Sequence, residues 1–213
     1  MSETLLSTAY LPPIEYFAII LQSDVWKIEN HEHYIKQSYR NRCNILTANG
    51  LLNLSIPVNK VDGNHTLIKD IRISYLNNWQ TNHWRAIESA YNKSPFFLYY
   101  RDDLEKFYKQ SYELLIDYNT ELLRFILKKL GISTEINFTE DFLSINQLEN
   151  DERYSIHPKL SKGNIIYPHY YQVFEEKHDF IPNVSIVDLL FNEGPESKYY
   201  LENIKITKSS EVD

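Results

Sequence analysis

The opening of the chain limits the fold most, because it predicts a strand, a helix and a second strand with very short connections. An apolar run from Thr4 to Tyr10 ends at Pro12-Pro13, and proline stops a strand ladder. Apolar residues then recur at helical spacing over 14–21, and residues 24–29 alternate as a strand does. Such a unit pairs its strands in parallel. The sequence therefore predicts a βαβ unit, and ligands of such sheets bind beyond the carboxyl ends of the strands.

The following segments predict a hairpin and then a layer of helices. Asn49-Gly50 is typical of a tight turn between strands at 45–47 and 51–58, and residues 67–75 predict another strand. Three amphipathic segments then predict helices, at 78–92, 94–108 and 112–130. The predicted class is α/β, with an N-terminal βαβ unit and a mixed sheet with a hairpin, covered by a helical layer. The alternative is α+β.

A chain of 213 residues is long enough for one large domain with an addition. We expect an α/β core with its helical layer at 1–145 and a C-terminal extension at 146–213 that packs on the core. In the extension, the apolar run from Val184 to Phe191 predicts a helix. Asp188 interrupts that run, and an unpaired buried carboxylate is costly, so we expect it to be a cap or a hydrogen-bonded acceptor.

Composition excludes several classes of function. The net charge of −7 argues against nonspecific binding of nucleic acid, which needs basic faces. Cys43 is the one cysteine, so no disulfide can form within the chain. No apolar run approaches the length of a membrane span, and the acidic, proline-interrupted start does not read as a signal peptide. We therefore expect a cytoplasmic protein without a membrane span, and we make no prediction of oligomeric state.

The stretch from Trp26 to Ile45 predicts a binding or catalytic surface. It combines two imidazoles, Lys36, Arg40, Arg42 and two tyrosines in a run that is too polar for a core element. Cations next to aromatic rings suit an anionic or sugar-like ligand, such as a nucleotide sugar. The alternative is a solvated loop with ordinary charges.

Three kinds of chemistry are open to these residues. His31 and His33, with His83 or Asp24, have the types needed for a metal site, although we expect no metal or other cofactor. Cys43 beside arginines offers a thiolate nucleophile. We favour acid–base and electrostatic catalysis, in which the cations hold an anion and His83 moves a proton. The predicted catalytic residues are His83, Lys36 and Tyr34. The predicted ligand-binding residues are Arg40, Asn41, Arg42, Trp79, His33, Arg153 and Gln172.

Several segments occur in a recognisable order: PPIEYF from Pro12, YIKQSYRNRCNIL from Tyr34, WQTNHWRAIESAYNKSPFF from Trp79 and SIVDLLFNEG from Ser185. In this order and spacing they resemble the WbqC-like proteins of bacterial surface-polysaccharide gene clusters, in a short form found in Bacteroidetes-type bacteria. The chain departs from the family at Ser7-Thr8, where Gln-Pro is usual. It departs again at Asn30-His31 and His33, where an acidic pair and a glutamine are usual.

The resemblance implies a transferase of O-antigen or capsule biosynthesis. One role that it implies is transfer of glycine or another aminoacyl group to a sugar. The alternative is a non-catalytic module that binds a nucleotide sugar or a partner enzyme. A hydrolase has no motif in its favour, because the sequence contains neither G-x-S-x-G nor a P-loop.

Overall fold

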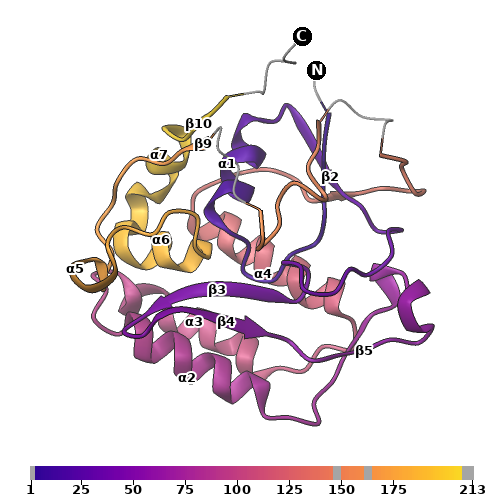
Figure 1. Cartoon of the computed structure of the whole chain (residues 1–213), viewed down its shortest axis with the longest axis horizontal. Coiled ribbons are helices and arrows are strands. Elements are labelled where there is room, and N and C mark those ends of the chain that lie inside the picture. Colours follow the sequence, from indigo (N-terminus) through magenta and orange to yellow (C-terminus); the bar gives the residue numbers. More distant parts are fainter. Residues whose placement is uncertain (1–2, 146–149, 161–164, 208–213) are drawn as a thin grey trace.

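A parallel four-stranded sheet with the order β7–β2–β1–β8 forms one part of the molecule. Figure 1 shows its strand β2 beside α1. The structure is a computed structural model that describes residues 3–145, 150–160 and 165–207. The central strands are β1 (Glu3–Leu6) and β2 (Val25–Ile28), joined by α1 (Ile14–Gln22), which confirms the predicted βαβ unit. The outer strands are β7 (Asn137–Phe138) and β8 (Asn150–Asp151).

Antiparallel pairs form the second β region. The predicted hairpin is confirmed as β3 (Arg42–Thr47) with β4 (Gly50–Ser55), and β5 (Val58–Asn59) pairs with β6 (Arg72–Ile73). The strand predicted over 67–75 is wrong in extent, because a 3-10 helix occupies Ile68–Asp70 and only two residues form β6. Ile68 and Ile71 are both fully buried, which matches one helical turn rather than the alternation of a strand.

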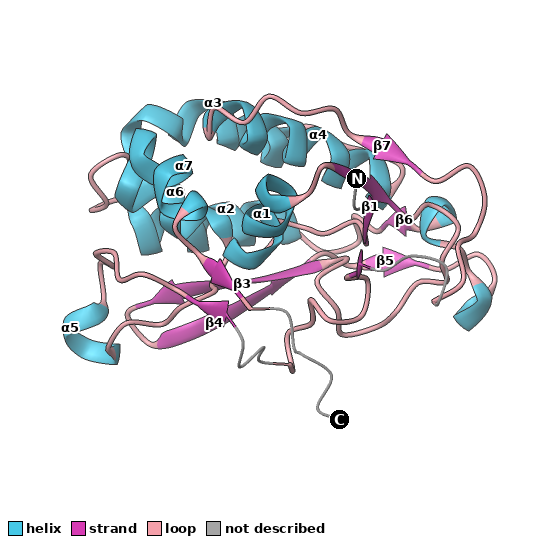
Figure 2. Cartoon of the chain, turned by 90° about the horizontal axis from the view of Figure 1, so that it is seen from above, coloured by secondary structure: helices cyan, strands magenta, loops and turns pink. Residues whose placement is uncertain are grey.

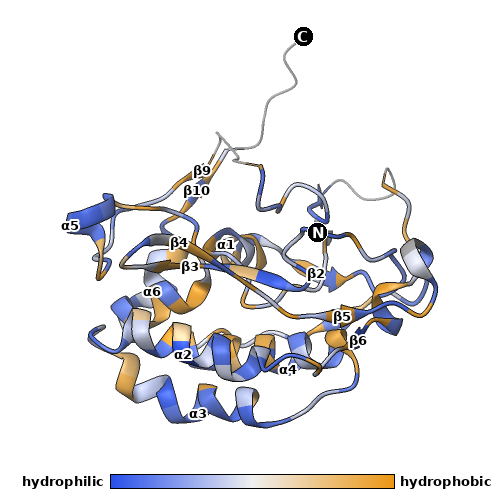
Figure 3. Cartoon of the chain, turned by 60° about the horizontal axis from the view of Figure 1, so that its bottom comes forward, coloured by the Kyte–Doolittle hydropathy of each residue, from blue (hydrophilic) through white to orange (hydrophobic). Residues whose placement is uncertain are grey.

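The three predicted helices are confirmed as α2 (Trp79–Tyr91), α3 (Phe97–Lys109) and α4 (Leu115–Lys129). Figure 2 shows these helices on one side of the β3–β4 hairpin. Hydrophilic and hydrophobic residues alternate along α3 and α4, as expected of helices with one buried face (Figure 3). Together with the parallel sheet, they confirm the predicted mixed class of helices and strands. No helix in the described ranges is long and apolar enough to cross a membrane.

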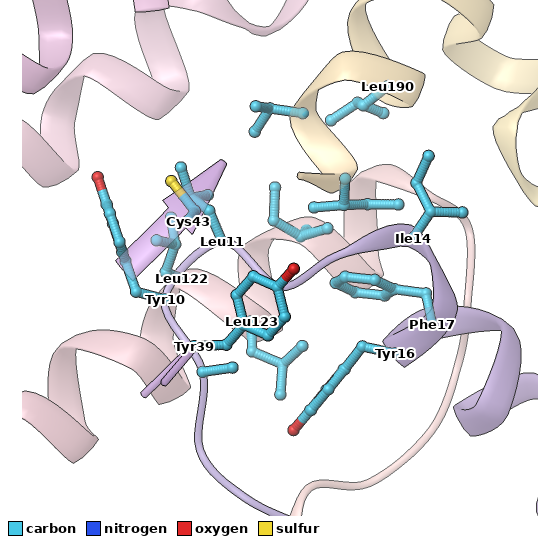
Figure 4. Packing of buried hydrophobic residues seen from close by; sticks show 14 of the residues in the cluster. Tyr10, Leu11, Ile14, Tyr16, Phe17, Tyr39, Cys43, Leu122, Leu123 and Leu190 are labelled. Atoms are coloured by element: carbon cyan, nitrogen blue, oxygen red, sulfur yellow. The ribbon is translucent and has the colours of Figure 1, made fainter. Parts of the chain in front are cut away.

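The C-terminal part joins the same hydrophobic core. Its helices are α5 (Glu175–His178), α6 (Ile186–Glu193) and α7 (Ser197–Glu202), and β9 (Ile165–Ile166) pairs with β10 (Lys205–Ile206). Both α6 and α7 contact α1. Figure 4 shows Leu190 of α6 near Ile14 and Phe17 of α1. The boundary after residue 145 stays a prediction, and β8 from beyond it pairs with β1 of the N-terminal sheet.

Gly194 ends α6 in a conformation that leaves no space for a side chain. Its φ is +54°, and an added Cβ would lie 2.5 Å from ring atoms of Phe96. We expect Gly194→Ala to lower the free energy of unfolding by about 3 kcal/mol, from left-handed strain and overpacking together. Gly131→Ala is the matched control, because Gly131 has φ +67° and no atom within 4 Å of the added Cβ. In urea denaturation, the control substitution should lower the free energy of unfolding by only about 1 kcal/mol. Equal losses would contradict the close contact.

Candidate functional site

The carboxyl edge of the parallel sheet carries a buried polar cluster. Glu29 directly follows β2, and its side chain is fully buried. Its carboxylate accepts hydrogen bonds from the Thr139 hydroxyl (2.7 Å) after β7, from the Leu143 N–H (3.0 Å) and from the His31 N–H (2.8 Å). Arg153, which follows β8, adds an ion pair at 3.2 Å. The Glu29 carboxylate therefore links the chain segments that follow β2, β7 and β8.

Arg153 is the second member of this cluster. Its Nε and Nη2 donate to the Asp151 carboxylate at 2.9 and 2.5 Å, while Nη1 reaches Glu29. The Ser7 hydroxyl, at the end of β1, donates to the Arg153 carbonyl oxygen. The guanidinium was predicted to bind ligand, and the structure places it in buried ion pairs instead. Charge-assisted pairs with two carboxylates indicate that Arg153 holds β2 and β8 together at this edge.

A second buried ion pair lies beside the first. Arg40 donates to both carboxylate oxygens of Glu32, at 2.8 and 2.5 Å, and also to the Ser7 hydroxyl at 2.7 Å. The side chains of Arg40 and Glu32 are only 3% and 1% exposed. The next residue, Asn41, donates its amide to the Ile56 carbonyl oxygen at 2.7 Å. Arg40 and Asn41 were both predicted to bind ligand, and in the structure their side chains form contacts that hold the loop before β3 in place.

The cavity between the two ion pairs is too small for a substrate. It has room for about one water molecule. Its lining combines residues after β1, the loop before β3 and the segment after β8: Ser7, Thr8, Ala9, Tyr16, Tyr39, Arg40, Glu152, Arg153 and Ile156. A substrate therefore does not fit between the two ion pairs.

The outer side of these loops is cationic, because their acids turn inward. Glu29 and Glu32 are buried against arginines, whereas Lys36 is exposed and Arg42 is half-buried. Within the ranges described, no ion pair includes Lys36 or Arg42. Lys60 belongs to the same surface, with its Nζ 5.3 Å from the centroid of the Tyr34 ring. Desolvation and then the positive charge of Lys36 lower the pKa of Lys60. We call Tyr34, Lys36, Arg42 and Lys60 the cationic face.

The segment after β8 adds two basic residues to the cationic face. Lys159 donates its ammonium to the side-chain oxygen of Gln37 at 2.8 Å, and its backbone N–H donates to His157 Nδ1 at 3.2 Å. Partial burial, Lys159 and then Arg40 and Arg42 lower the pKa of His157. The ring is therefore mostly neutral at pH 7. Because Nδ1 accepts the hydrogen bond from the Lys159 N–H, Nε2 of the neutral ring carries the proton and can donate to an anion.

His31 and His33 have separate neighbours. The His31 Nδ1 lies 3.2 Å from the Lys69 ammonium, which donates to it. The His33 ring, exposed to solvent, contacts the His65 ring at 6.0 Å between centroids. Residues 29–33 do not form the strand that would place both imidazoles on one face. No group of metal-binding side chains is found in the described part of the chain.

His83 and Trp79 lie in the aromatic core. His83 is 5% exposed, its Nδ1 is 3.0 Å from the Tyr10 hydroxyl, and its ring also hydrogen bonds to the Ser55 backbone. Trp79 is buried, with its ring 5.2 Å from that of His83. Burial lowers the pKa of His83 to about 4, so the imidazole is neutral at pH 7. These contacts favour a role in packing for both residues.

Two further sequence candidates lie away from the cationic face. Gln172 is fully buried and donates to the Ile181 carbonyl oxygen (3.0 Å) and to Asp188 (3.1 Å). Cys43 is fully buried, and burial raises the pKa of its thiol, which disfavours a thiolate nucleophile. The sequence interpretation missed Lys60. Nothing in the sequence shows that the chain after Lys60 returns beside His33, where Leu67 forms a β-bridge in the structure.

The fold and the face together define an α/β protein with a cationic surface at the carboxyl edge of a parallel sheet. A sequence profile of the WbqC-like protein family matches residues 8–168 and 160–200, so the chain belongs to this family. A protein of Mycobacterium tuberculosis (strain ATCC 25618 / H37Rv), described as "Uncharacterized protein Rv1507c", is 30% identical over an alignment of 217 positions, and the alignment covers 90% of this chain and 94% of that protein. No solved structure matches the chain.

Proposed function

We propose that this protein is a transferase of surface-polysaccharide biosynthesis that modifies a sugar, and that the group it transfers is glycine or another aminoacyl group. The observation that carries the proposal is the cationic face at the carboxyl ends of the parallel strands, where open α/β sheets bind their ligands. An acidic protein that buries its acids at this edge and exposes its cations there is suited to a negatively charged substrate.

The chemistry of such a transfer fits the exposed groups. An amine or hydroxyl of the sugar attacks the carbonyl of an activated aminoacyl donor, the bond to the leaving group breaks, and a proton is released. Negative charge develops on the carbonyl oxygen during this step. Lys36 is the proposed residue that stabilises this charge, and the Tyr34 ring is the proposed contact for the substrate. We leave His83 out of the proposal, because its ring is buried and hydrogen bonded in the core.

A non-catalytic binding module is the second candidate. It is favoured by the engagement of Arg40 and Arg153 in ion pairs, which leaves few polar groups available for chemistry. Such a module would bind the same nucleotide sugar, or a partner enzyme, without converting it. Turnover separates the two candidates.

The test is to incubate the protein with nucleotide sugars that carry an amino group and with glycyl-tRNA or glycyl adenylate as donor. We expect mass spectrometry to detect the sugar nucleotide with one glycyl residue added. Lys36→Ala should lower kcat/KM by at least about 10-fold, because it removes a charge that acts on the transition state. Lys198→Ala is the matched control, since Lys198 is an exposed lysine of α7 paired with Glu202. Binding without turnover for every donor and sugar would favour the binding module.

A further inference from the structure

We infer that the rings of Phe142 and Tyr154 form a stacking subsite for the base of a nucleotide, at the carboxyl edge of the parallel sheet. This inference rests on the proposed function, because it specifies which part of a nucleotide-linked sugar the protein recognises. The ligand class is a nucleoside phosphate, and its flat base is the part that contacts the rings.

Both rings lie against one buried cation. The Cζ of Arg153 lies over the Phe142 ring, 5.5 Å from its centroid, and over the Tyr154 ring at 5.6 Å. The Arg153 side chain has no exposed surface, whereas Phe142 and Tyr154 are 50% and 39% exposed. A cation is attracted to the face of an aromatic ring, so the inner face of each ring is already in contact with the guanidinium. The exposed surface therefore belongs to the outer faces and edges of the two rings.

The two rings come from opposite edges of the sheet. Phe142 follows β7 and Tyr154 follows β8, and these outer strands lie on either side of β2 and β1. Because all four strands are parallel, both segments leave the sheet at its carboxyl edge, where open α/β sheets bind ligands. Both centroids lie within 5.6 Å of one Cζ atom, so a single small ligand can reach both rings.

Contacts that need no ligand hold the backbone beside each ring. Next to the first ring, the Leu143 N–H donates to the Glu29 carboxylate at 3.0 Å. Next to the second ring, the Arg153 N–H donates to the Asp151 carboxylate at 3.1 Å. A surface that is already ordered loses little conformational entropy when a ligand binds. The two rings are thus suited to bind a ligand without rearrangement of the chain.

Exposed phenylalanine is confined to this region of the described chain. Phe138 of β7 and Phe142 are 36% and 50% exposed, and every other phenylalanine that the structure describes is buried or half-buried. Exposed apolar surface that gathers in one place marks a binding site more often than single exposed residues do. With Tyr154, this edge of the sheet therefore has a concentration of exposed aromatic surface.

The polar groups around the rings favour a base over a sugar as the contact. Sugar hydroxyls are recognised by available donors and acceptors, and those next to the rings are bonded to one another. Thr139 and Arg153 both donate to Glu29, and Arg153 also donates to Asp151. A base needs no such groups, because every base has a π-face that stacks on an aromatic ring. The surroundings of the two rings therefore suit a base.

The subsite adjoins the cationic face. Tyr154 precedes His157 and Lys159 in the same segment, and the Lys159 ammonium donates to the side chain of Gln37 at 2.8 Å. A nucleotide whose base lies on the rings can thus extend its phosphate toward positive charge.

The experiment measures binding of AMP, UMP and ribose 5-phosphate to the full chain by saturation-transfer difference NMR. We expect the base protons of both nucleotides to receive the most saturation, and ribose 5-phosphate to bind at least about 10-fold more weakly. Phe142→Leu and Tyr154→Leu should each weaken binding of AMP by about 10-fold, because leucine keeps an apolar cover over Arg153 but has no ring.

Two matched variants serve as controls. Tyr154→Phe keeps the ring, and Tyr199→Leu removes a tyrosine of α7 that is 67% exposed, so both should bind AMP like the parent. Urea denaturation shows whether each variant is folded. If a leucine variant does not fold, the saturation pattern of the parent still decides, because the base protons must dominate it.

Several results would overturn the inference. Equal binding of AMP by the parent and both leucine variants would place the base elsewhere. Binding of ribose 5-phosphate as tightly as AMP would mean that the sugar phosphate and not the base is recognised. Dimerisation of the parent in sedimentation equilibrium, lost in Phe142→Leu and without binding of either nucleotide, would assign the rings to a protein interface.

The same measurements separate this inference from the proposed function. If the parent transfers glycine to sugar phosphates that lack a base as fast as to nucleotide sugars, and does not bind AMP, this inference fails and the proposed function stands. If the rings bind AMP but no donor and sugar give transfer, the inference stands and the proposed transferase fails.

Discussion

Replacement of Arg153 by alanine is expected to lower the free energy of unfolding by about 3–5 kcal/mol, because it leaves buried carboxylates without a cation. Arg153 is fully buried and bonds both Asp151 and Glu29, whose side chains are 9% and 0% exposed. The remaining bonds of Glu29 come from Thr139 and backbone N–H groups, which do not cancel its charge. Urea denaturation at neutral pH measures the loss.

Matched variants separate lost charge from lost packing. Arg124→Ala removes an exposed arginine paired with Glu121, and such a surface pair contributes at most about 1 kcal/mol. Arg153→Met keeps much of the buried stem but not the charge, so it should remain strongly destabilised. Adding Glu29→Gln to Arg153→Met should then recover part of the loss, since it removes one of the unpaired charges. A loss for Arg153→Ala no larger than that for Arg124→Ala would contradict the assigned role.

The parts of the fold that the sequence predicted have local signals. The βαβ unit and the three helices have apolar residues at the regular spacing of a strand or a helix, and this spacing can be read within each segment alone. β7 and β8 were not predicted, because each has two residues and is held only by pairing with β2 or β1. Such strands have no periodicity that a sequence can display.

For the candidate site, the sequence does not predict which charged side chains point inward and which point to solvent. The stretch 29–42 was recognised as functional from its cations, but their directions depend on partners elsewhere in the fold. Arg40 turns inward because Glu32 and Ser7 lie beside it, whereas Lys36 turns outward. Arg40 should therefore affect stability first, and Lys36 should affect binding first. A charged residue in a polar loop does not reveal this difference by its type alone.

Asp188→Ala is the second substitution with a large expected effect, a loss of about 3 kcal/mol in the free energy of unfolding. Asp188 is 1% exposed in α6 and accepts hydrogen bonds from the hydroxyls of Tyr91 (2.9 Å) and Tyr170 (2.7 Å) and from the Gln172 amide (3.1 Å). In the alanine variant, the two tyrosine hydroxyls and the Gln172 amide stay buried but lose the carboxylate that accepts their hydrogen bonds. The sequence expectation of a buried hydrogen-bond partner at this position is thus fulfilled by groups from α2 and from the segment before α6. Asp117→Ala, an exposed aspartate in the first turn of α4, is the control and should lose less than about 1 kcal/mol.

Asp188→Asn tests whether the carboxylate carries a charge that the fold must tolerate. Burial raises the pKa of Asp188, although hydrogen bonds from Tyr170 and Tyr91 oppose the rise. A raised pKa means that the folded protein holds this proton more tightly than the unfolded chain does. The stabilising contribution is therefore fully present below about pH 4, the ordinary range of aspartate, and is lost as pH rises through the folded-state pKa.

Asparagine has no such titration, so the parent should lose stability relative to Asp188→Asn as pH rises from about 4 to about 7. Urea denaturation of both proteins across this range measures the difference. A constant difference, or one that favours the parent more at higher pH, would show that the hydrogen bonds outweigh the cost of burying the charge.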